Sequence, residues 1–333
     1  MNNFQQDTGL GFLEQEPKTV DLPELEFLER GIWEALSDSE GPVREMCSHI
    51  LNGRGKRIRP LLVLHSGLIF SGLTSELRNA AVAAELIHMA SLVHDDVIDN
   101  SSIRRHKPSV NSLWDNTYAV LCGDYLFAKA FSLMSSNTLT GCMNYMVEAI
   151  GNMCRGEIEQ ANNRFNFDLG LDAYYDCIAK KTAIFLACCC KSGAHASGAD
   201  ELYLKLVGEY GLNLGFAFQI IDDILDFSGR VEVMGKTRYN DLRQGNITLP
   251  VILLLNHDRH GPRARDIIKR HTSVEQLVDH LVNLVHKSGV MDKAFDVART
   301  YITKAKQCLS LLPGSRHTDF LRNLADKLLL RTS

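Results

Sequence analysis

The sequence predicts an all-α protein built as a single large helical bundle. Apolar residues recur with a 3.6-residue period along most of the chain, and alternating period-two segments are almost absent. Only eight of the 333 residues are proline, so few breaks interrupt the periodic segments. We expect residues 1–20 to form a flexible segment and residues 21–333 to form one domain.

The periodic segments define the expected helices in chain order. They cover residues 22–38, 43–52, 58–70, 74–99, 118–135, 139–164, 172–196, 200–228, 248–257, 264–270, 274–287, 290–310 and 317–330. Thr74, with Leu77 three residues later, indicates a capped helix start, and Pro60 falls in a first turn, where its missing N–H is tolerated. Residues 100–116 and 228–246 are polar and aperiodic, which predicts two loops that cover a site sensitive to water.

Composition excludes several classes of protein. The chain is 45% hydrophobic and 23% charged, as in globular proteins with a substantial core, and its net charge of −4 lacks the basic footprint of a nucleic-acid binder. We expect no secretory signal, no transmembrane segment and a cytoplasmic location. The nine cysteines include the run Cys188–Cys190 and form no CxxC pair, so we expect free, buried thiols.

Two acidic clusters of the form DDxxD carry the strongest chemical signal. They are residues 95–99 (DDVID) and 222–226 (DDILD), each at the end of a long apolar helix. The first and last carboxylates of a cluster lie on one helical face, where they repel each other unless a cation lies between them. Mg²⁺ prefers such oxygen ligands together with substrate phosphates. One such cluster alone is as typical of a solvated helix end as of a metal site. Two clusters favour a metal-bound diphosphate held between two helices.

Basic residues accompany these clusters. Arg104 and Arg105 follow the first, and Lys236 follows the second. Arginine forks suit phosphate oxygens, although an arginine pair is often only a solvated surface. Residues 53–60 (GRGKRIRP) place four cations at a helix start, which favours a further anion site over a loop with stray charges. Two basic groups indicate two phosphorylated ligands.

These motifs give the chain a family resemblance. It resembles the trans-isoprenyl diphosphate synthases (polyprenyl synthetases) over roughly residues 40–330, and bacterial medium- and long-chain members most of all. The ordered motifs are GKRIRP (55–60), ELIHMASLVHDDVID (85–99), RR (104–105), GDYLFAKA (123–130), GEIEQ (156–160), KTA (181–183), GFAFQIIDDILD (215–226) and GKT…DLRQGNITLP (235–250). The resemblance implies an isoprenoid-synthase bundle with a central active-site cavity, and a Mg²⁺-dependent prenyltransferase.

The resemblance also implies roles for individual residues. The implied Mg²⁺ ligands, holding three ions per substrate-bound site, are Asp95, Asp99 and Asp222, supported by Asp96, Asp223 and Asp226. The implied allylic diphosphate site comprises Arg104, Lys181, Gln219 and Lys236, and the isopentenyl diphosphate site Lys56, Arg59, His88 and Arg105. Lys181, Thr182 and Gln219 are the expected catalytic residues, the last two as dipoles near a carbocation. A lone His88 would more often be an ordinary helix histidine.

Product length is expected to depend on residues before the first cluster. Ala90 and Ser91 are small, so we expect them to leave room for the growing product in a tunnel along this helix. Ile87 is expected to lie deeper in that tunnel. Further candidates for the tunnel wall or floor, which are equally typical of an ordinary core, are Ala83, Phe131, Met143 and Met146. By resemblance we expect a product longer than the four-unit compound, about C30 to C40.

The chain departs from the family pattern at three places. His106 stands where the family usually has glycine, and Asn246 where it often has lysine, which puts one phosphate contact in doubt. Residues 237–240 (TRYN) replace a commoner Pro-x-Gly-x pattern. None of these departures removes an implied metal ligand.

The expected partners are isopentenyl diphosphate and an allylic diphosphate, farnesyl or geranylgeranyl. The resemblance implies a homodimer, with a heterodimer containing a small helper subunit as the alternative. Two other functions were weighed: a class I terpene cyclase, and a non-catalytic regulatory subunit. The intact GKRIRP segment disfavours the first, because it serves a second diphosphate, and the two complete acidic clusters disfavour the second.

Overall fold

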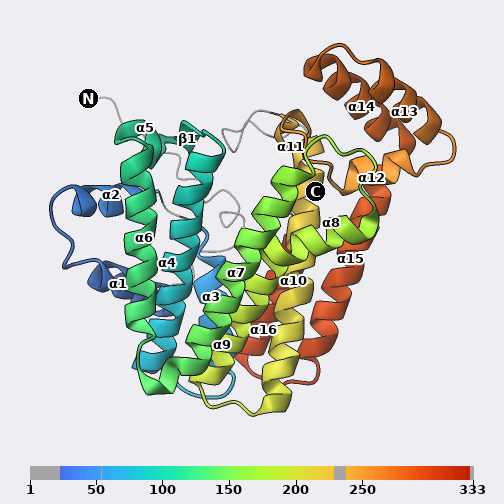
Figure 1. Ribbon diagram of the computed structural model, residues 1–333. Coiled ribbons are helices and arrows are strands. Elements are labelled where there is room, and N and C mark those ends of the chain that lie inside the picture. The colour runs from blue at the N-terminus through green and yellow to red at the C-terminus, as the bar shows by residue number, and fades with distance from the viewer. Residues whose placement is uncertain (1–22, 54, 229–237, 331–333) are drawn as a thin grey trace, which may run out of the picture.

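The computed structural model describes residues 23–53, 55–228 and 238–330, which form a bundle of α-helices (Figure 1). The predicted all-α class is confirmed. Strand structure in the described ranges is limited to β1 (Ile103–Arg104) and β2 (Lys107–Pro108), paired antiparallel. The predicted flexible segment 1–20 and the predicted phosphate ligand Lys236 lie outside the described residues.

The N-terminal half follows the predicted helices closely. Its elements are α1 (Pro23–Ala35), α2 (Gly41–Leu51), α3 (Ile58–Leu68), α4 (Ser75–Ile98), α5 (Val110–Leu113), α6 (Asn116–Leu133), the short 3₁₀ turn η1 (Asn137–Leu139) and α7 (Thr140–Asn162). The hydroxyl of Thr74 accepts a hydrogen bond from the Leu77 N–H at 3.1 Å, so the predicted cap of α4 is confirmed. The β1–β2 hairpin and α5 occupy the predicted loop 100–116.

The C-terminal half contains two elements that periodicity did not predict, the π segment η2 (Ala179–Ala183) and the short helix α11 (Asn240–Arg243), which lies in the predicted loop 228–246. Its elements are α8 (Leu171–Ile178), η2 (Ala179–Ala183), α9 (Ile184–Ala196), α10 (Glu201–Phe227), α11 (Asn240–Arg243), α12 (Leu249–Leu255), α13 (Gly261–Arg270), α14 (Val274–Ser288), α15 (Val290–Leu309) and α16 (Arg316–Leu330). The segment η2 is π-helical and divides the predicted helix 172–196 in two. Wide turns of this kind are frequent at functional sites.

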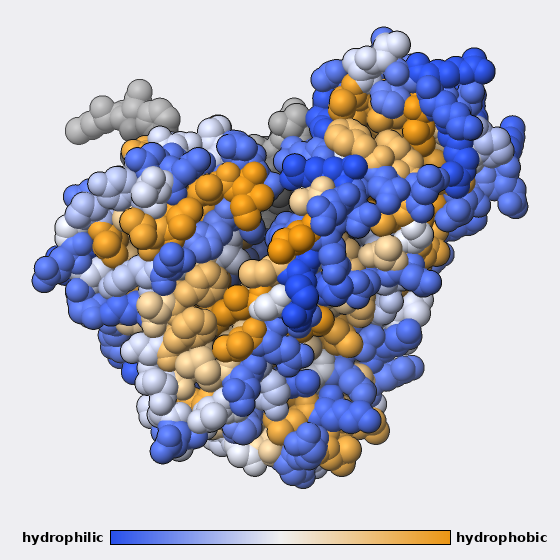
Figure 2. All heavy atoms as spheres, viewed as in Figure 1, coloured by the Kyte–Doolittle hydropathy of each residue, from blue (hydrophilic) through white to orange (hydrophobic). Residues whose placement is uncertain are grey.

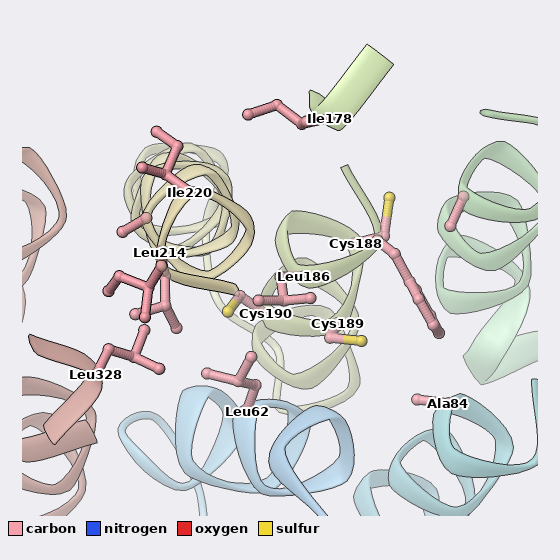
Figure 3. Close-up of a cluster of buried hydrophobic side chains, with 14 of the residues drawn as sticks. Leu62, Ala84, Ile178, Leu186, Cys188, Cys189, Cys190, Leu214, Ile220 and Leu328 are labelled. Carbon is pink, nitrogen blue, oxygen red and sulfur yellow. The ribbon is translucent and has the colours of Figure 1, made fainter. Parts of the chain in front are cut away.

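Helix α9 lies inside the bundle, surrounded by other helices. Figure 3 shows its Leu186 and Cys188–Cys190 among side chains from α3, α4, α10 and α16, and the three cysteines point in different directions. These cysteines are buried and form no disulfide bonds, as predicted. The expectation of buried thiols is wrong for Cys154, which is exposed on α7.

Two glycines allow backbone-to-backbone contact around α9. A Cβ built on Gly193 would lie 1.9 Å from the carbonyl oxygen of Val63 on α3. A Cβ on Gly215 of α10 would lie 2.4 Å from the Cα of Ala183, the last residue of η2. Both distances are shorter than any real Cβ contact, so α3 and α10 pack against this central segment without intervening side chains.

The surface view shows apolar residues gathered over the α5–α6 side of the bundle and a largely hydrophilic rim around the α13–α14 hairpin (Figure 2). On α6 the exposed apolar side chains include Val120 and Leu121, and on α7 they include Val147 and Ile158. No helix in the described part of the chain is both long enough and apolar enough to span a membrane.

Candidate active site

The first acidic cluster occupies the last turn of α4, and its members face different surroundings. Asp96 is buried at 3% exposure, and both of its carboxylate oxygens accept from Nε of Arg104, at 2.7 and 2.8 Å. Asp95 is half-buried, and Asp99, the C-cap of α4, is 41% exposed. Asp96 therefore fixes Arg104, while Asp95 and Asp99 remain on the face that turns away from the core.

The second cluster shows the same division of roles at the end of α10. Asp223 is buried at 2% exposure and accepts hydrogen bonds from the Tyr174 hydroxyl at 2.6 Å and from Nε2 of Gln219 at 3.0 Å. Asp222 and Asp226 are half-buried. Asp226 accepts from the backbone N–H groups of Asn240 and Asp241, at 3.1 and 3.3 Å, which attaches the start of α11 to the cluster.

A polar cavity of about 130 Å³ lies where the end of the first cluster meets the segment that follows the second. Its walls come from α4, α7, the π segment and the α11 region; the lining residues are Ile98, Asp99, Glu157, Gln160, Ala161, Arg164, Lys181, Asn240, Asp241, Gln244 and Asn246. Lys181 is therefore the only predicted diphosphate ligand among the described residues that line it. Seven of the ten other lining side chains offer an oxygen atom.

Lys181 is held by the predicted GEIEQ motif of α7. Its Nζ lies 2.6 Å from Oε1 of Glu157 and donates to Oε1 of Gln160 at 2.6 Å. A Cβ on Gly156 would lie 2.8 Å from Cγ of Lys181, so only glycine leaves room for the lysine to pass. The π segment and this motif thus direct a cation toward the cavity. The nearby Glu157 carboxylate raises the pKa of Lys181 against the opposing effect of burial, so it carries its charge.

The other two predicted catalytic residues form a chain of hydrogen bonds. The Thr182 hydroxyl donates to Oε1 of Gln219 at 2.8 Å, and Gln219 in turn donates to Asp223. Burial, with Asp241 and Asp222 nearby, raises the pKa of Asp223 to about 8, although the Tyr174 and Gln219 hydrogen bonds act to lower it. The chain ends on Tyr174, a residue for which the sequence offered no functional signal.

The carboxylates fit a Mg²⁺ ion that is held jointly by protein and substrate. Within residues 23–53, 55–228 and 238–330, no three His, Cys, Asp or Glu side chains converge to form a metal cage. Mg²⁺ does not require one, because it usually binds through one or two carboxylates plus phosphates and keeps several waters. Burial and the Glu157 carboxylate raise the pKa of Asp95 to about 6. The positive charges that the protein places near Asp95 therefore do not fully offset the cost of ionising it. Asp95 and Asp99 on α4 and Asp222 on α10 would hold the metal.

A second cavity, of about 60 Å³, lies along α4, between α2 and the β1–β2 hairpin. Arg105 lines it and donates from Nη1 to the Gly53 carbonyl at 2.7 Å. His88 also lines it and lies 3.0 Å, Nε2 to Nη1, from Arg59. Arginine cannot accept a hydrogen bond, so Nε2 of His88 is the acceptor and its Nδ1 carries the proton. Burial and the arginines around it hold the pKa of His88 well below its usual range, which keeps it neutral.

Among the described residues of the GRGKRIRP segment, Gly53 and Arg57 line this cavity, whereas Lys56 and Arg59 do not. Arg57 is 6% exposed and pairs with Glu29 at 2.7 Å and Glu85 at 2.6 Å, so its charge is largely neutralised inside the protein. Lys56 is exposed, and Arg54 lies outside the described residues. Nε of Arg59 is buried and has no hydrogen-bond partner in the described part of the chain. Arg59 therefore has a buried donor that an anionic ligand would satisfy.

The predicted chain-length residues lie on α4. Ile87 and Ala90 are fully buried, and Ser91 is half-buried, with its hydroxyl donating to the His88 carbonyl at 2.9 Å. Ser91 precedes Asp95 by one helical turn, so it lies on the same face as that carboxylate. Ala83 and Met146 are fully buried in the core, and Phe131 and Met143 are partly buried against it.

Sequence reasoning missed three residues of the site. Glu157 pairs with Lys181, Tyr174 binds Asp223, and Arg164 lies 3.8 Å, Nη2 to Oδ1, from Asp99. Glu157 belongs to a motif that was recognised, so a signal existed for it. Arg164 follows α7 in an irregular segment, and only the fold brings it to the first cluster.

Comparison with known proteins decides the family. A family model described as Polyprenyl synthetase matches residues 40–285. The chain belongs to the polyprenyl synthetase family. Over 302 residues it is 37% identical to heptaprenyl diphosphate synthase component 2 of Geobacillus stearothermophilus, an alignment covering 91% of this chain and 94% of that protein.

Solved structures of polyprenyl synthetases have the same fold. The heptaprenyl diphosphate synthase of Staphylococcus aureus superposes with a TM-score of 0.87 at 31% identity, covering 93% of this chain and 98% of that one. The polyprenyl synthase of Caulobacter crescentus CB15, complexed with calcium and isoprenyl diphosphate, gives 0.86 at 32% identity, covering 93% and 95%. The predicted family, fold and prenyltransferase class are thereby confirmed.

Proposed function

We propose that this prenyltransferase condenses isopentenyl diphosphate repeatedly, head to tail, onto an allylic diphosphate (farnesyl or geranylgeranyl) to give a long all-trans polyprenyl diphosphate. One observation carries this proposal: two cavities lie along α4, one lined by Asp99 and Lys181, and the other by a second group of cations that includes Arg105. A cyclase ionises one diphosphate and has no use for the second group. Relatives named as heptaprenyl diphosphate synthases support the long product.

The acidic cavity would bind the allylic substrate. Mg²⁺, in the proposed number of three ions, would supply charge neutralisation for the diphosphate leaving group. Lys181, which lines this cavity and is oriented by Glu157 and Gln160, would bind the phosphate oxygens directly. Arg104, which is oriented by Asp96 and lines the second cavity, would reach the same phosphate from that side. The oxygen atoms of Thr182 and Gln219 would face the developing carbocation as fixed dipoles. The lysine proposed from the second loop, Lys236, lies outside the described residues.

The second cavity would bind isopentenyl diphosphate. Arg59 and Arg105 supply the guanidinium groups, and Lys56 at the exposed rim adds a third cation. His88 accepts from Arg59 and orients it, so we assign His88 as a positioning residue for this site. The double bond of the bound substrate would attack the allylic carbon, and the released diphosphate would take the proton that is lost when the new trans double bond forms.

Ala90 and Ser91 would allow the product to extend along α4, with Ile87 further along the path. Neither residue is large enough to close such a path one turn below Asp95. Their small size supports a product beyond the four-unit compound, in agreement with the seven-unit name of the bacterial relatives.

We propose a homodimer as the working assembly. The exposed apolar residues Val120 and Leu121 on α6, and Val147 and Ile158 on α7, supply a surface that a second copy would cover. The name component 2 of a bacterial relative implies a further component in that protein, which makes a helper subunit the alternative. Gel filtration of the purified chain, combined with its activity alone, distinguishes the two assemblies.

Mass analysis of products tests the function. The purified chain is incubated with farnesyl diphosphate and Mg²⁺, with and without isopentenyl diphosphate. A ladder of all-trans products ending near seven units, formed only with isopentenyl diphosphate, is the expected result. A hydrocarbon released without isopentenyl diphosphate would identify a cyclase instead. Activity that appears only after adding a partner subunit would assign the chain as the catalytic half of a heterodimer.

A further inference from the structure

The two cations of the acidic cavity differ in how firmly the protein holds them. In the described part of its lining, the cations are Lys181 and Arg164, against the carboxylates of Asp99, Glu157 and Asp241. The Lys181 ammonium is held at 2.6 Å by Glu157 and at 2.6 Å by Gln160. Within the part of the chain that the structure describes, Arg164 has only the ion pair with Asp99, at 3.8 Å, and its side chain is 42% exposed. A guanidinium has five N–H donors, so most of the donors of Arg164 can reach a ligand.

The backbone beside Arg164 is fixed against the loop that follows the second acidic cluster. The N–H of Phe165 donates to the Gly245 carbonyl at 2.7 Å. Phe165 has a φ of +58° and Gly245 a φ of +85°, and a Cβ on Gly245 would lie 2.6 Å from the Phe165 ring. The contact therefore requires glycine at 245 and holds the residue after Arg164 against the residue before Asn246. Arg164 thus lies between the end of the first cluster and the loop of the second.

Asn246 contributes no charge to this wall. It is 8% exposed, and its Oδ1 is buried without a hydrogen-bond partner among the described residues. Its Nδ2 makes one long contact, 3.5 Å, with Oε1 of Gln244. An amide that lines the cavity with an unsatisfied oxygen cannot neutralise a diphosphate, whereas Arg164 on the adjoining wall can.

We propose that Arg164 is a diphosphate-binding residue, and that it supplies the positive charge that Asn246 does not. In the substrate-free protein its guanidinium pairs loosely with Asp99. With the metal-bound allylic diphosphate in the site, Asp99 would hold the metal, and the guanidinium of Arg164 would donate to the phosphate oxygens instead. This inference rests on the proposed function, since it concerns the allylic substrate of the same site.

Binding measurements on a charge-matched set of variants test the inference. The probe is farnesyl thiolodiphosphate, which resists ionisation, titrated by calorimetry in Mg²⁺. Arg164→Gln is expected to weaken its binding by about ten- to a hundredfold, the effect of losing one hydrogen bond to a charged group. Arg155→Gln is the control, because Arg155 is also an exposed arginine of this region and contacts only Asn152 of its own helix, at 3.0 Å. The Arg155→Gln variant should bind the probe as tightly as the parent protein does.

A charge-relocation variant separates a phosphate contact from a structural role. Asn246→Lys in the Arg164→Gln background restores a cation on the same cavity and should recover most of the lost affinity. The KM for isopentenyl diphosphate should stay unchanged throughout, and the thermal unfolding midpoints of Arg164→Gln and Arg155→Gln should agree. If Arg164→Gln destabilises the fold, Arg164→Lys keeps the charge and should bind the probe more tightly than Arg164→Gln.

Unchanged probe binding in Arg164→Gln, equal losses in Arg155→Gln, or no recovery with Asn246→Lys would each overturn the inference. The parent chain distinguishes these results from failure of the proposed function. If the parent chain binds the probe but makes no polyprenyl product, the proposed function is wrong. The variants then still measure whether Arg164 binds the diphosphate.

Discussion

The Thr182 hydroxyl donates a hydrogen bond to Oε1 of Gln219 at 2.8 Å, and this contact joins the π-helical segment to α10. Because Gln219 also donates to Asp223 at 3.0 Å, the orientation of its amide group is fixed from both ends. The polar pair that we propose to face a carbocation therefore depends on a buried carboxylate one helical turn away.

Tyr174→Phe tests that dependence. The substitution removes the hydroxyl that donates to Asp223 at 2.6 Å and leaves a buried carboxylate oxygen without this partner. We expect a loss of about 1 to 3 kcal/mol in the free energy of unfolding. We also expect a lower kcat, since Asp223, which accepts from Gln219, loses one of the two side-chain hydrogen bonds that hold it. Urea unfolding and steady-state kinetics measure the two effects. Tyr175→Phe is the control, because its hydroxyl is not in this chain of hydrogen bonds, and equal losses in both variants would contradict the argument.

Asp95→Asn should affect stability and activity in opposite directions. Burial and Glu157 raise the pKa of Asp95 to about 6 in the folded chain, above its value of about 3.9 in an unfolded one. The stabilising contribution of the protonated Asp95 side chain to the folded state is complete at low pH. It is lost as the pH rises from about 4 to about 6. At pH 7.5 in a metal chelator, the variant should therefore be more stable than the parent by about 1 to 2 kcal/mol, after allowance for solvent screening.

The same variant should lose at least about a hundredfold in kcat with Mg²⁺ present, because it lacks a ligand that stabilises the leaving group. Asp279→Asn, an exposed carboxylate on α14, is the control and should change neither quantity. A destabilised but active Asp95→Asn would show that the carboxylate is structural.

Ser91→Phe should shorten the product. The side chain is half-buried one turn before Asp95, where a phenyl ring would project across the path of the growing chain. Ala90→Phe should act in the same direction, but Ala90 is fully buried, so overpacking of the core is expected to destabilise that variant as well. Mass spectrometry of the products, with Ser75→Phe at the exposed start of α4 as control, measures the effect. Products of parental length from Ser91→Phe would refute the proposed path.

Stability below pH 6.5 should depend on His65. It is 3% exposed, stacks on Phe320 at 3.6 Å, and its Nδ1 lies 3.1 Å from Nδ1 of His317. Burial, with His317 and Arg316 nearby, lowers the pKa of His65 to about 3. The folded chain keeps it neutral while the unfolded chain protonates near 6.5. Stability is therefore lost as the pH falls from about 6.5 to about 3, by up to a few kcal/mol.

His65→Gln should remove part of that pH dependence, because glutamine can hydrogen-bond without titrating. Urea unfolding at pH 5 and pH 7.5 gives the difference for each protein. His286→Gln, at an exposed position on α14, should leave the parental difference unchanged. If His65→Gln behaves like His286→Gln, the acid sensitivity has another origin.

Periodicity predicted the helices because burial of one face repeats along each of them, and α4, α10 and α15 begin and end within a residue or two of expectation. It did not predict the π segment, because a wide turn changes hydrogen bonding without changing which residues are apolar. The DDxxD clusters placed the carboxylates correctly in sequence. Only packing shows that the second aspartate of each cluster faces inward, to Arg104 or to Gln219.

Contacts between distant segments explain the remaining differences. The GRGKRIRP segment contains four cations, but the two glutamates that neutralise Arg57 come from α1 and α4. Arg164 lies outside every recognised motif, and the approach of Phe165 to Gly245 brings it to Asp99. Such pairings depend on tertiary structure, which the residues around one position do not encode.

The two points of backbone contact, between α3 and α9 and between α10 and the π segment, also bear on how such an enzyme can be re-engineered. The Val63 carbonyl lies where a Cβ of Gly193 would be, and Ala183 lies against Gly215, so neither glycine can be replaced without moving a backbone. Enlarging or narrowing the interior from that side would force backbones apart. The opposite side, where α4 meets α6 through side chains, offers sites at which one substitution changes size without moving a helix. Libraries that aim at altered product length should therefore be confined to α4 and α6.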